Sequence, residues 1–285
     1  MNTAIVTDSN SGILEAEGKE LGVSVLPMPV IVEGETHYEG RNLSHDTFYQ
    51  YLSQHRQVSS SQPSIDSVQE MWDTLLRSGY DEILHIPMSS GLSGAFQSAN
   101  MLAKEYYGMV HVVDNHRISV TQRHSVLDAL ALRRQGCTAK EIKGKLEQSA
   151  YDSIIFIGVE TLEYLKKGGR MTPAGAAVGE ILNIKPLLII KGERLDAYAK
   201  VRGSMKCKKR LIQEMKKRAD EFHEKGERIR VRVAGSFADK EAEQKWKDMA
   251  WETFAGEDIS YDPLTFSVSS HVGPGAFGMG ISKVL

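Results

Sequence analysis

Three short turns rich in hydroxyl groups carry the side chains of this sequence that are best suited to bind an anion. They are TDSNSG at residues 7–12, SSSQPS at residues 59–64 and SSGLSG at residues 89–94. In a parallel α/β sheet, ligands bind beyond the carboxyl ends of the strands, where the backbone N–H groups of helix N-termini hold anions. In the third turn, Gly91 and Gly94 let the backbone approach a ligand closely, and Ser93 offers a donor at the start of a helix. We therefore expect a carboxylate or phosphate oxygen near Ser93.

Two other interpretations of these turns remain open. Serine and aspartate are the commonest helix-capping residues, so a cap explains any single turn equally well. The segment GLSGA also approximates the G-x-S-x-G nucleophile elbow of hydrolases, with Ala95 in place of the last glycine. Because Ser93, a later acid and His271 keep the hydrolase order along the chain, a serine hydrolase of acyl esters is a competing hypothesis.

His271 lies in the segment SSHVGPGA, whose two glycines and proline predict a compact loop between apolar strands. A histidine in such a loop donates to a ligand oxygen while the protein holds its other ring nitrogen. A structural histidine without a ligand is the alternative. His271 is thus a candidate for the same anion site.

Short apolar segments alternate with helical patterns over residues 1–150, which predicts parallel β/α construction. Residues 23–32 are apolar as well, but Pro27 and Pro29 remove two backbone donors, so we expect a sheet edge or an extended connection there. SSSQPS is expected to be a loop. Three residues are expected to begin helices as N-caps, namely Ser44, Ser64 and Thr138.

The pattern changes near Tyr151, and we predict a second domain over residues 151–285. KPLLIIKGERLDAYAKV is typical of an antiparallel hairpin, which the first half lacks. After a long amphipathic helix and an alternating strand, residues 259–268 and 276–284 are expected to complete a sheet of mixed type.

Composition limits the classes of function. The chain of 285 residues is 41% hydrophobic and 25% charged, with a net charge of −2. This composition is typical of a globular protein, and the balanced charge gives no reason to expect a nucleic acid partner. Cys137 and Cys207 lack metal-ligand spacing, which favours a reducing compartment. With no signal sequence and no long apolar run, the expected location is the cytoplasm.

Eight motifs in a fixed order carry a resemblance to a known family. They are TDSNSG, SSQPS, SSGLSGAFQSA, VVDNHRIS, ETLEYLKKGGRM, ILNIKPLLIIKGE, KVRG and HVGPGA. This set resembles the DegV family from residue 3 to about residue 280. The resemblance implies an α/β fold with an N-terminal three-layer α/β/α domain, a C-terminal α/β domain and a lipid between them. It also implies the role of a fatty-acid-binding subunit of bacterial fatty acid kinase, without catalytic residues of its own.

The resemblance assigns roles to individual positions. Ser61 or Ser60, Ser93 and His271 resemble the side chains that hold the fatty acid carboxylate, and Gly94 contributes backbone. Family members often carry threonine near the start of this motif, so either Ser60 or Ser61 is the contact.

Two arginines and a small-residue segment also have expected roles. Arg170 in GGRM and Arg202 in KVRG resemble basic positions at the pocket mouth and the kinase-docking surface. Small residues leave space for a tail, and the candidates are Ala174, Ala176, Ala177 and Val178 near Ile181 and Leu182.

The expected ligand and partners follow from the same resemblance. They are a long-chain fatty acid, a separate ATP-dependent kinase subunit and, during lipid exchange, transient contact with a membrane. No cofactor or metal is expected. A half of a sugar-kinase-like, phosphate-binding protein is a third hypothesis, but no G-x-x-x-x-G-K-[ST] motif is present in the sequence to support phosphoryl transfer.

Overall fold

The computed structural model describes residues 2–171, 183–192 and 195–285. Every residue of β1 (Thr3–Asp8) and β6 (Glu82–Ile86) is buried, as expected for central strands that are covered on both faces. They pair in parallel and are flanked by β2 (Ser24–Leu26) and β7 (Val110–Val112), which gives the order β2-β1-β6-β7. The predicted parallel sheet is confirmed.

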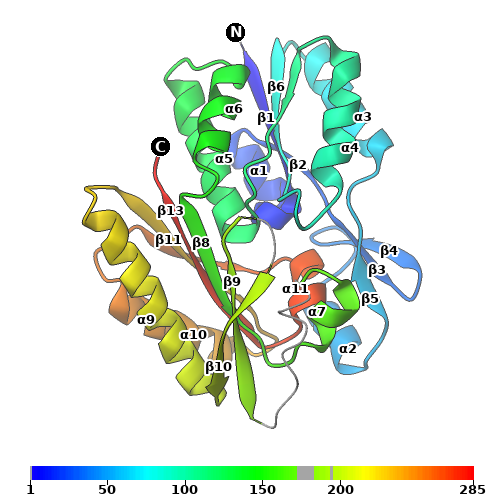
Figure 1. Cartoon of the computed structure of the whole chain (residues 1–285). Coiled ribbons are helices and arrows are strands. Elements are labelled where there is room, and N and C mark those ends of the chain that lie inside the picture. The colour runs from blue at the N-terminus through cyan, green and yellow to red at the C-terminus, as the bar shows by residue number, and fades with distance from the viewer. Residues whose placement is uncertain (1, 172–182, 193–194) are drawn as a thin grey trace.

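Helices cover both faces of the parallel sheet (Figure 1). One face packs on α3 (Ile65–Arg77) and α4 (Ala95–Leu102), with Trp72 fully buried in the contact. The other face packs on α5 (Ser119–Arg134) and α6 (Ala139–Gln148). These three layers confirm the expected α/β/α arrangement. Shorter helices complete this part, namely η1 (Ser9–Ser11), α1 (Glu15–Leu21) and η2 (Ala103–Tyr106).

The predicted N-caps are confirmed by their hydrogen bonds. The Ser44 and Ser64 side chains accept the backbone N–H groups of Thr47 and Ser67, which begins α2 (His45–Ser53) and α3. Thr138 and Glu141 form a capping box at the start of α6. These local patterns act within one helical turn, so the sequence alone identifies them.

A six-stranded mixed sheet forms the second half, in the order β10-β9-β8-β13-β11-β12. Neighbouring strands are antiparallel except for the parallel pair β11 and β12. The predicted hairpin is confirmed as the pair β9 and β10. The strands are β8 (Ser153–Gly158), β9 (Ile184–Ile190), β10 (Leu195–Arg202), β11 (Ile229–Ser236), β12 (Ile259–Pro263) and β13 (Ala276–Lys283).

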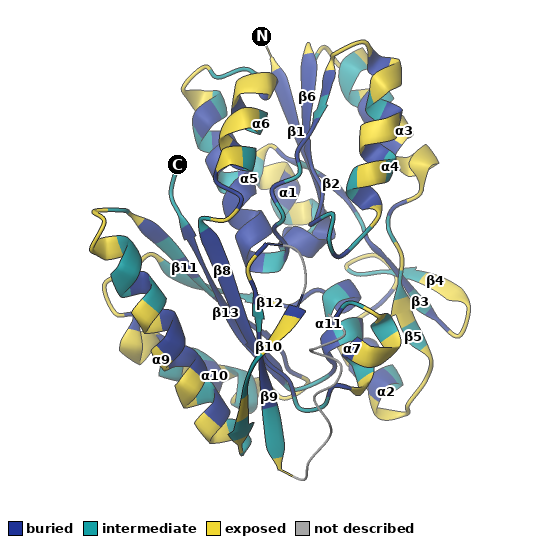
Figure 2. Cartoon of the chain, in the orientation of Figure 1, coloured by how far each residue is buried: buried dark blue, intermediate teal, exposed yellow. Residues whose placement is uncertain are grey.

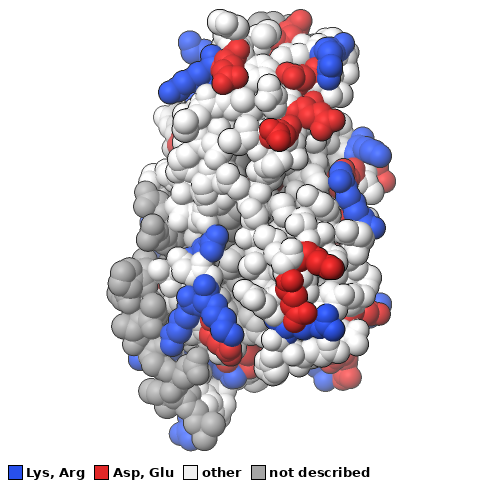
Figure 3. All heavy atoms as spheres, turned by 90° about the vertical axis from the view of Figure 1, so that its right-hand side faces the viewer, with Lys and Arg blue, Asp and Glu red and all other residues white. Residues whose placement is uncertain are grey.

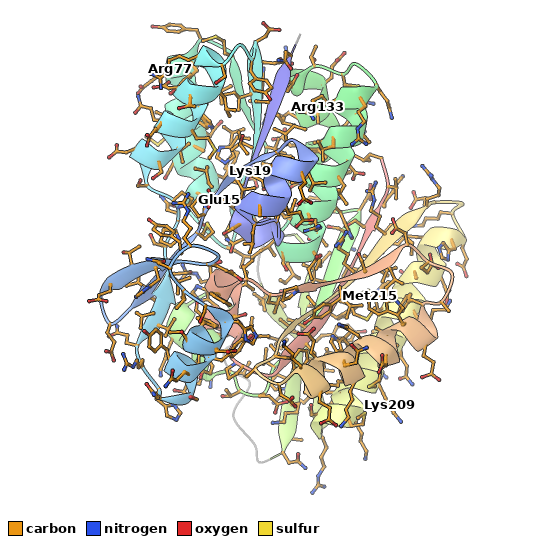
Figure 4. The ribbon with its side chains drawn as sticks, turned by 180° about the vertical axis from the view of Figure 1, so that it is seen from behind. Glu15, Lys19, Arg77, Arg133, Lys209 and Met215 are labelled. Atoms are coloured by element: carbon orange, nitrogen blue, oxygen red, sulfur yellow. The ribbon has the colours of Figure 1, made fainter. Side chains whose placement is uncertain are left out.

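The two faces of the mixed sheet have different neighbours. One face packs on α9 (Ser204–His223) and α10 (Lys240–Thr253), where Trp246 is fully buried. Part of the other face turns towards the first half, and α5 contacts β13 and β11 there. In Figure 2 the strands of both sheets are mostly buried, whereas the helices are exposed on their outer sides. In Figure 4, Glu15 and Lys19 of α1 lie near the middle of the molecule, and Lys209 of α9 lies near its lower end.

A third, three-stranded antiparallel sheet was not expected from the sequence. Its order is β4-β3-β5, and its strands are β3 (Pro29–Val32), β4 (Glu35–Tyr38) and β5 (Val58–Ser60). The start of SSSQPS is therefore a strand and not a loop. Residues 23–32 form two strands that separate at Pro27, and they belong to two different sheets. The small sheet and α2 pack on Phe266 of the second half, whose ring stacks on Phe48 at 4.3 Å.

The strand expected over residues 259–268 is confirmed only as far as Pro263, and the expected loop around His271 is wrong, because the segment before His271 is helical. β12 ends at Pro263, and α11 (Phe266–Val272) follows. The helix begins because the Glu39 carboxylate accepts the Phe266 N–H at 2.8 Å, although the two residues are far apart in the chain. It packs against α7 (Glu163–Gly168) and β5. The predicted domain boundary near Tyr151 falls between α6 and β8 and stays a prediction.

Candidate ligand-binding site

An apolar cavity lies between the parallel sheet and the mixed sheet. It contains about 860 Å³ of empty space, including its opening to solvent. Its walls come from loops after β1, β2 and β6, from the start of α5, and from β8, β9 and β13. The side chains that make it apolar include Met28, Met88, Leu92, Ile155, Ile157 and Ile190. Such a cavity accommodates a hydrocarbon ligand, because burial removes apolar surface from water on both partners.

Several polar side chains interrupt this mostly apolar wall. Ser60 Oγ lies 2.8 Å from His271 Nε2, which joins the end of β5 to α11. Ser93, in the loop before α4, lines the same cavity. The predicted Ser60, Ser93 and His271, which lie far apart in the sequence, thus all line one cavity, and Ser60 and His271 are in direct contact.

The structure distinguishes between the two candidate serines. Ser60 is half-buried, and its hydroxyl is held by His271 at the cavity. Ser61 also lines the cavity, but it is exposed and its hydroxyl donates to the Gln62 carbonyl at 3.2 Å. Ser61 thus has a backbone acceptor for its hydrogen, whereas the partner of Ser60 is an imidazole that itself lines the cavity.

Ser93 has a free hydrogen to donate. Its Oγ accepts the Ala95 N–H at 3.1 Å, and the hydroxyl hydrogen has no acceptor among the described residues. Gly94 is exposed at the start of α4, and it is not part of the cavity wall. An ideal Cβ at this glycine would lie 2.9 Å from Gln62 Oε1, so the small residue lets the two loops approach each other.

His271 is held tightly from the side of α7. An ideal Cβ on Gly168 would lie 2.4 Å from His271 Nδ1, so only glycine lets α7 approach the imidazole this closely. Burial, with a smaller effect of the Arg170 cation, lowers the pKa of His271 from 6.5 to about 4. The imidazole is therefore neutral at pH 7, and it has one N–H to donate.

The two candidate arginines are placed differently. Arg170 lines the cavity, is half-buried and donates to the Gly168 carbonyl. Arg202 is the exposed last residue of β10 and does not line the cavity. Of the two, only Arg170 brings a positive charge to the cavity wall. The expected tail residues from Ala174 to Leu182 lie outside the described residues.

Asn10 and Ser267 line the cavity and were missed by the sequence analysis. Both are 3% exposed, and the Ser267 hydroxyl donates to Asn10 Oδ1. Next to them, Asp8 is fully buried and accepts the backbone N–H groups of Asn10 and Met88 at 3.0 and 2.8 Å. Burial raises the pKa of Asp8 to about 6, although these hydrogen bonds oppose the shift. The hydroxyl-rich turn TDSNSG was the available signal, since Asn10 lies within it.

The geometry does not support a serine hydrolase. His271 Nε2 is bonded to Ser60, and no hydrogen bond joins His271 to Ser93 among the described residues. A nucleophilic serine needs a base within hydrogen-bond reach of its own hydroxyl. The arrangement instead presents hydroxyl groups to a ligand, with the His271 imidazole bonded to one of them.

Surface charge near the cavity is modest. α7 carries the exposed Lys166 and Lys167. On the face that Figure 3 shows, a few basic side chains gather with acidic ones beside them. Lys167 pairs with Glu163 at 2.6 Å. On α9, Lys208 is half-buried over the ring of Phe277 at 5.3 Å. The basic residues are therefore partly neutralised by their neighbours.

An α/β fold of this topology, with an internal apolar cavity that ends in hydroxyl and imidazole groups, defines a class of proteins suited to hold an amphipathic ligand. A family model for DegV proteins, which describes them as uncharacterised, matches residues 2–284. The chain belongs to the DegV family.

Relatives and solved structures agree with this assignment over the whole chain. A DegV domain-containing protein of Deinococcus radiodurans is 31% identical over 100% of this chain and 99% of its own. The structure of a fatty-acid-binding DegV family protein of Thermus thermophilus is similar, with a TM-score of 0.87, 29% identity, and coverage of 99% of this chain and 100% of that one. A fatty-acid-binding DegV family protein of Streptococcus agalactiae has a TM-score of 0.87, 27% identity and 99% coverage of both chains.

The described residues lack two kinds of feature. No described helix is long and apolar enough to cross a membrane. Within the same part of the chain, no group of three or more histidine, cysteine, aspartate or glutamate residues is arranged to hold a metal ion.

Proposed function

We propose that this protein binds one long-chain fatty acid in the cavity, with the carboxylate at Ser60, Ser93 and His271 and the tail along the apolar wall. The observation that carries the proposal is the apolar cavity with a small cluster of hydrogen-bond donors in its wall. The Thermus and Streptococcus relatives, which are fatty-acid-binding DegV proteins of the same fold, support it.

The tail supplies most of the binding energy in this proposal. Burial gives about 0.8 kcal/mol per methylene, so a 16-carbon chain contributes on the order of 10 kcal/mol before ordering costs. A hydrogen bond to a charged group adds only about 1.5–3 kcal/mol. The head-group contacts therefore set the orientation of the ligand and select a carboxylate over other polar groups.

The neutral imidazole fits a carrier role. In the tautomer with the proton on Nε2, the imidazole donates to Ser60 Oγ, and the Ser60 hydroxyl hydrogen is free to point at the ligand, as is the Ser93 hydrogen. Arg170 adds an attractive positive charge near this part of the cavity. The carboxylate is held by donors and is not attacked, so we propose that this chain is not itself an enzyme.

Hexadecanoate and hexadecanol differ in the head group alone, so their relative affinity tests the proposed site. We expect hexadecanoate to bind more tightly, by roughly 10-fold or more, because two hydroxyl donors and a nearby cation favour the charged group. Competition with a fluorescent fatty acid measures both dissociation constants. Equal affinities would show that the hydroxyl cluster does not hold the carboxylate.

We further propose that the protein presents its fatty acid to a separate ATP-dependent kinase, which phosphorylates the carboxylate to an acyl phosphate for phospholipid synthesis. Arg202 is exposed at the end of β10 and lies outside the cavity wall, so it is available to a partner. In the same proposal, the protein works in the cytoplasm and exchanges lipid during transient contact with a membrane. The two free cysteines are consistent with a reducing compartment.

A charge reversal separates the kinase role from lipid binding. Arg202→Glu is expected to lower acyl phosphate formation in a reconstituted reaction by about 10-fold or more, since losing an interfacial charge contact costs on the order of 2 kcal/mol. Its fatty acid affinity should stay unchanged. Lys209→Glu, on the outer side of α9, is the matched control and should have little effect. Loss of both activities in Arg202→Glu would contradict a docking role.

A further inference from the structure

One pair of polar side chains in the cavity is unexplained by carboxylate binding. Asn10, on η1, and Ser267, on α11, both line the cavity and are both 3% exposed. Burying an amide and a hydroxyl costs free energy unless their hydrogen bonds are made. An exclusively hydrocarbon ligand next to them would offer no such bond.

The amide of Asn10 is only partly satisfied by the protein. Its Oδ1 accepts the Ser267 hydroxyl, and its Nδ2 contacts the thioether of Met88. A thioether is a weak acceptor, so the NH₂ group keeps donor capacity. If the amide is turned over, the Nδ2 group donates to Ser267 and the carbonyl faces Met88, which offers no donor. Ser267 Oγ also lies 3.2 Å from Thr265 Oγ1, so the unused hydrogen-bonding capacity of the pair, in either orientation, lies mainly on the Asn10 amide.

The pair lies near the carboxylate cluster along α11. Ser267 precedes His271 by four residues, so both side chains lie on one face of the helix, about 6 Å apart along its axis. A fatty acid with its carboxylate at His271 and its tail along this wall passes Asn10 and Ser267 with its first few carbons. The pair is thus placed to contact a substituent close to the carboxyl end.

We propose that Asn10 and Ser267 form a subsite for a hydroxyl group near the carboxyl end of the acyl chain, so that 3-hydroxy fatty acids are accepted ligands. The inference rests on the proposed fatty acid binding and adds the chemical class of the chain. A hydroxyl both donates and accepts, so it fits either orientation of the amide. An unsubstituted chain leaves the subsite without a partner.

The test compares three ligands by competition with a fluorescent fatty acid. They are hexadecanoate, 3-hydroxyhexadecanoate and 12-hydroxyhexadecanoate, which have the same chain length. We expect the wild type to bind the 3-hydroxy acid at least as tightly as hexadecanoate, and the 12-hydroxy acid at least 10-fold less tightly than the 3-hydroxy acid. The reason is that a hydroxyl further along the chain meets the apolar wall and loses its bonds to water.

Variants assign the effect to the pair. Asn10→Leu keeps similar volume and should weaken the 3-hydroxy acid by about 3- to 10-fold relative to hexadecanoate, which corresponds to one lost hydrogen bond. Ser267→Ala is a milder second variant with the same direction of change. Ser270→Ala is the matched control, because Ser270 lies on the same helix, bonds only the Ser267 carbonyl and does not line the cavity.

The outcomes separate the subsite from the proposed function. If no fatty acid binds, the proposed function fails. If hexadecanoate binds and the 3-hydroxy acid is at least 10-fold weaker in the wild type, the subsite is refuted. The subsite is also refuted if the ratio of the two dissociation constants, for hexadecanoate and the 3-hydroxy acid, is unchanged in both Asn10→Leu and Ser267→Ala. If instead a variant loses affinity for both acids equally, the pair holds the carboxylate and the subsite is refuted as well.

Discussion

Replacing Ser60 by alanine removes the hydroxyl that joins β5 to His271 and, in the proposed complex, one donor to the carboxylate. Ser60 Oγ lies 2.8 Å from His271 Nε2 and lines the cavity. A hydrogen bond to a charged group is worth about 1.5–3 kcal/mol, so we expect fatty acid affinity to fall by roughly 10- to 100-fold. Binding should stay measurable, because the tail contributes on the order of 10 kcal/mol.

Ser61→Ala is the matched control for Ser60→Ala. Ser61 is exposed, and its hydroxyl already donates to the Gln62 carbonyl. Its removal should change affinity by less than about 2-fold, as for a surface polar group without a ligand contact. Isothermal titration with hexadecanoate measures both variants, and circular dichroism checks that both are folded. A larger loss in Ser61→Ala than in Ser60→Ala would refute the assignment of the carboxylate contact.

Three further changes test the site and its support. Burial raises the pKa of Glu39 from 4.5 to about 7, so the wild type loses stability as the pH rises through that window. Glu39→Gln should therefore raise the free energy of unfolding by up to about 3 kcal/mol at pH 8 and have little effect below pH 4.5. Thermal melts at both pH values measure the change, and equal shifts in melting temperature would contradict it. Gly168→Ala should weaken fatty acid binding and cost about 1–3 kcal/mol of stability, since the new Cβ would lie 2.4 Å from His271 Nδ1. An unaltered melting temperature and affinity would contradict this packing argument. Shortening hexadecanoate to tetradecanoate should lower affinity by roughly 10-fold through two lost methylenes, whereas equal titration curves would mean that the tail is not buried.

Local signals in the sequence were sufficient for much of the fold. Capping residues such as Thr138, and the alternation of apolar segments with helices, predicted the parallel sheet and its covering helices, because these patterns depend on neighbours within a few residues. The hairpin of β9 and β10 was predicted in the same way. Long-range contacts were not visible. α11 looked like a strand and loop because its start is stabilised by Glu39 from a distant segment.

Only part of the site could be predicted from the sequence, because some of its residues meet only through long-range contacts. Ser93 stands out in a turn with two glycines, and turn chemistry alone suggested an anion there. His271 entered through the family resemblance, and its partner Ser60 could be told from Ser61 only by geometry. Asn10 and Ser267 were missed because they lie far apart in the sequence and meet only across the cavity.

Native mass spectrometry of protein purified from a bacterial host without added lipid tests the central claim most directly. We expect one non-covalent adduct per chain, with the mass of a long-chain fatty acid, that is lost when the protein is unfolded. A second spectrum after incubation with hexadecanoate should show the same stoichiometry. Protein that carries no adduct in the first spectrum and takes up no fatty acid in the second would contradict the account.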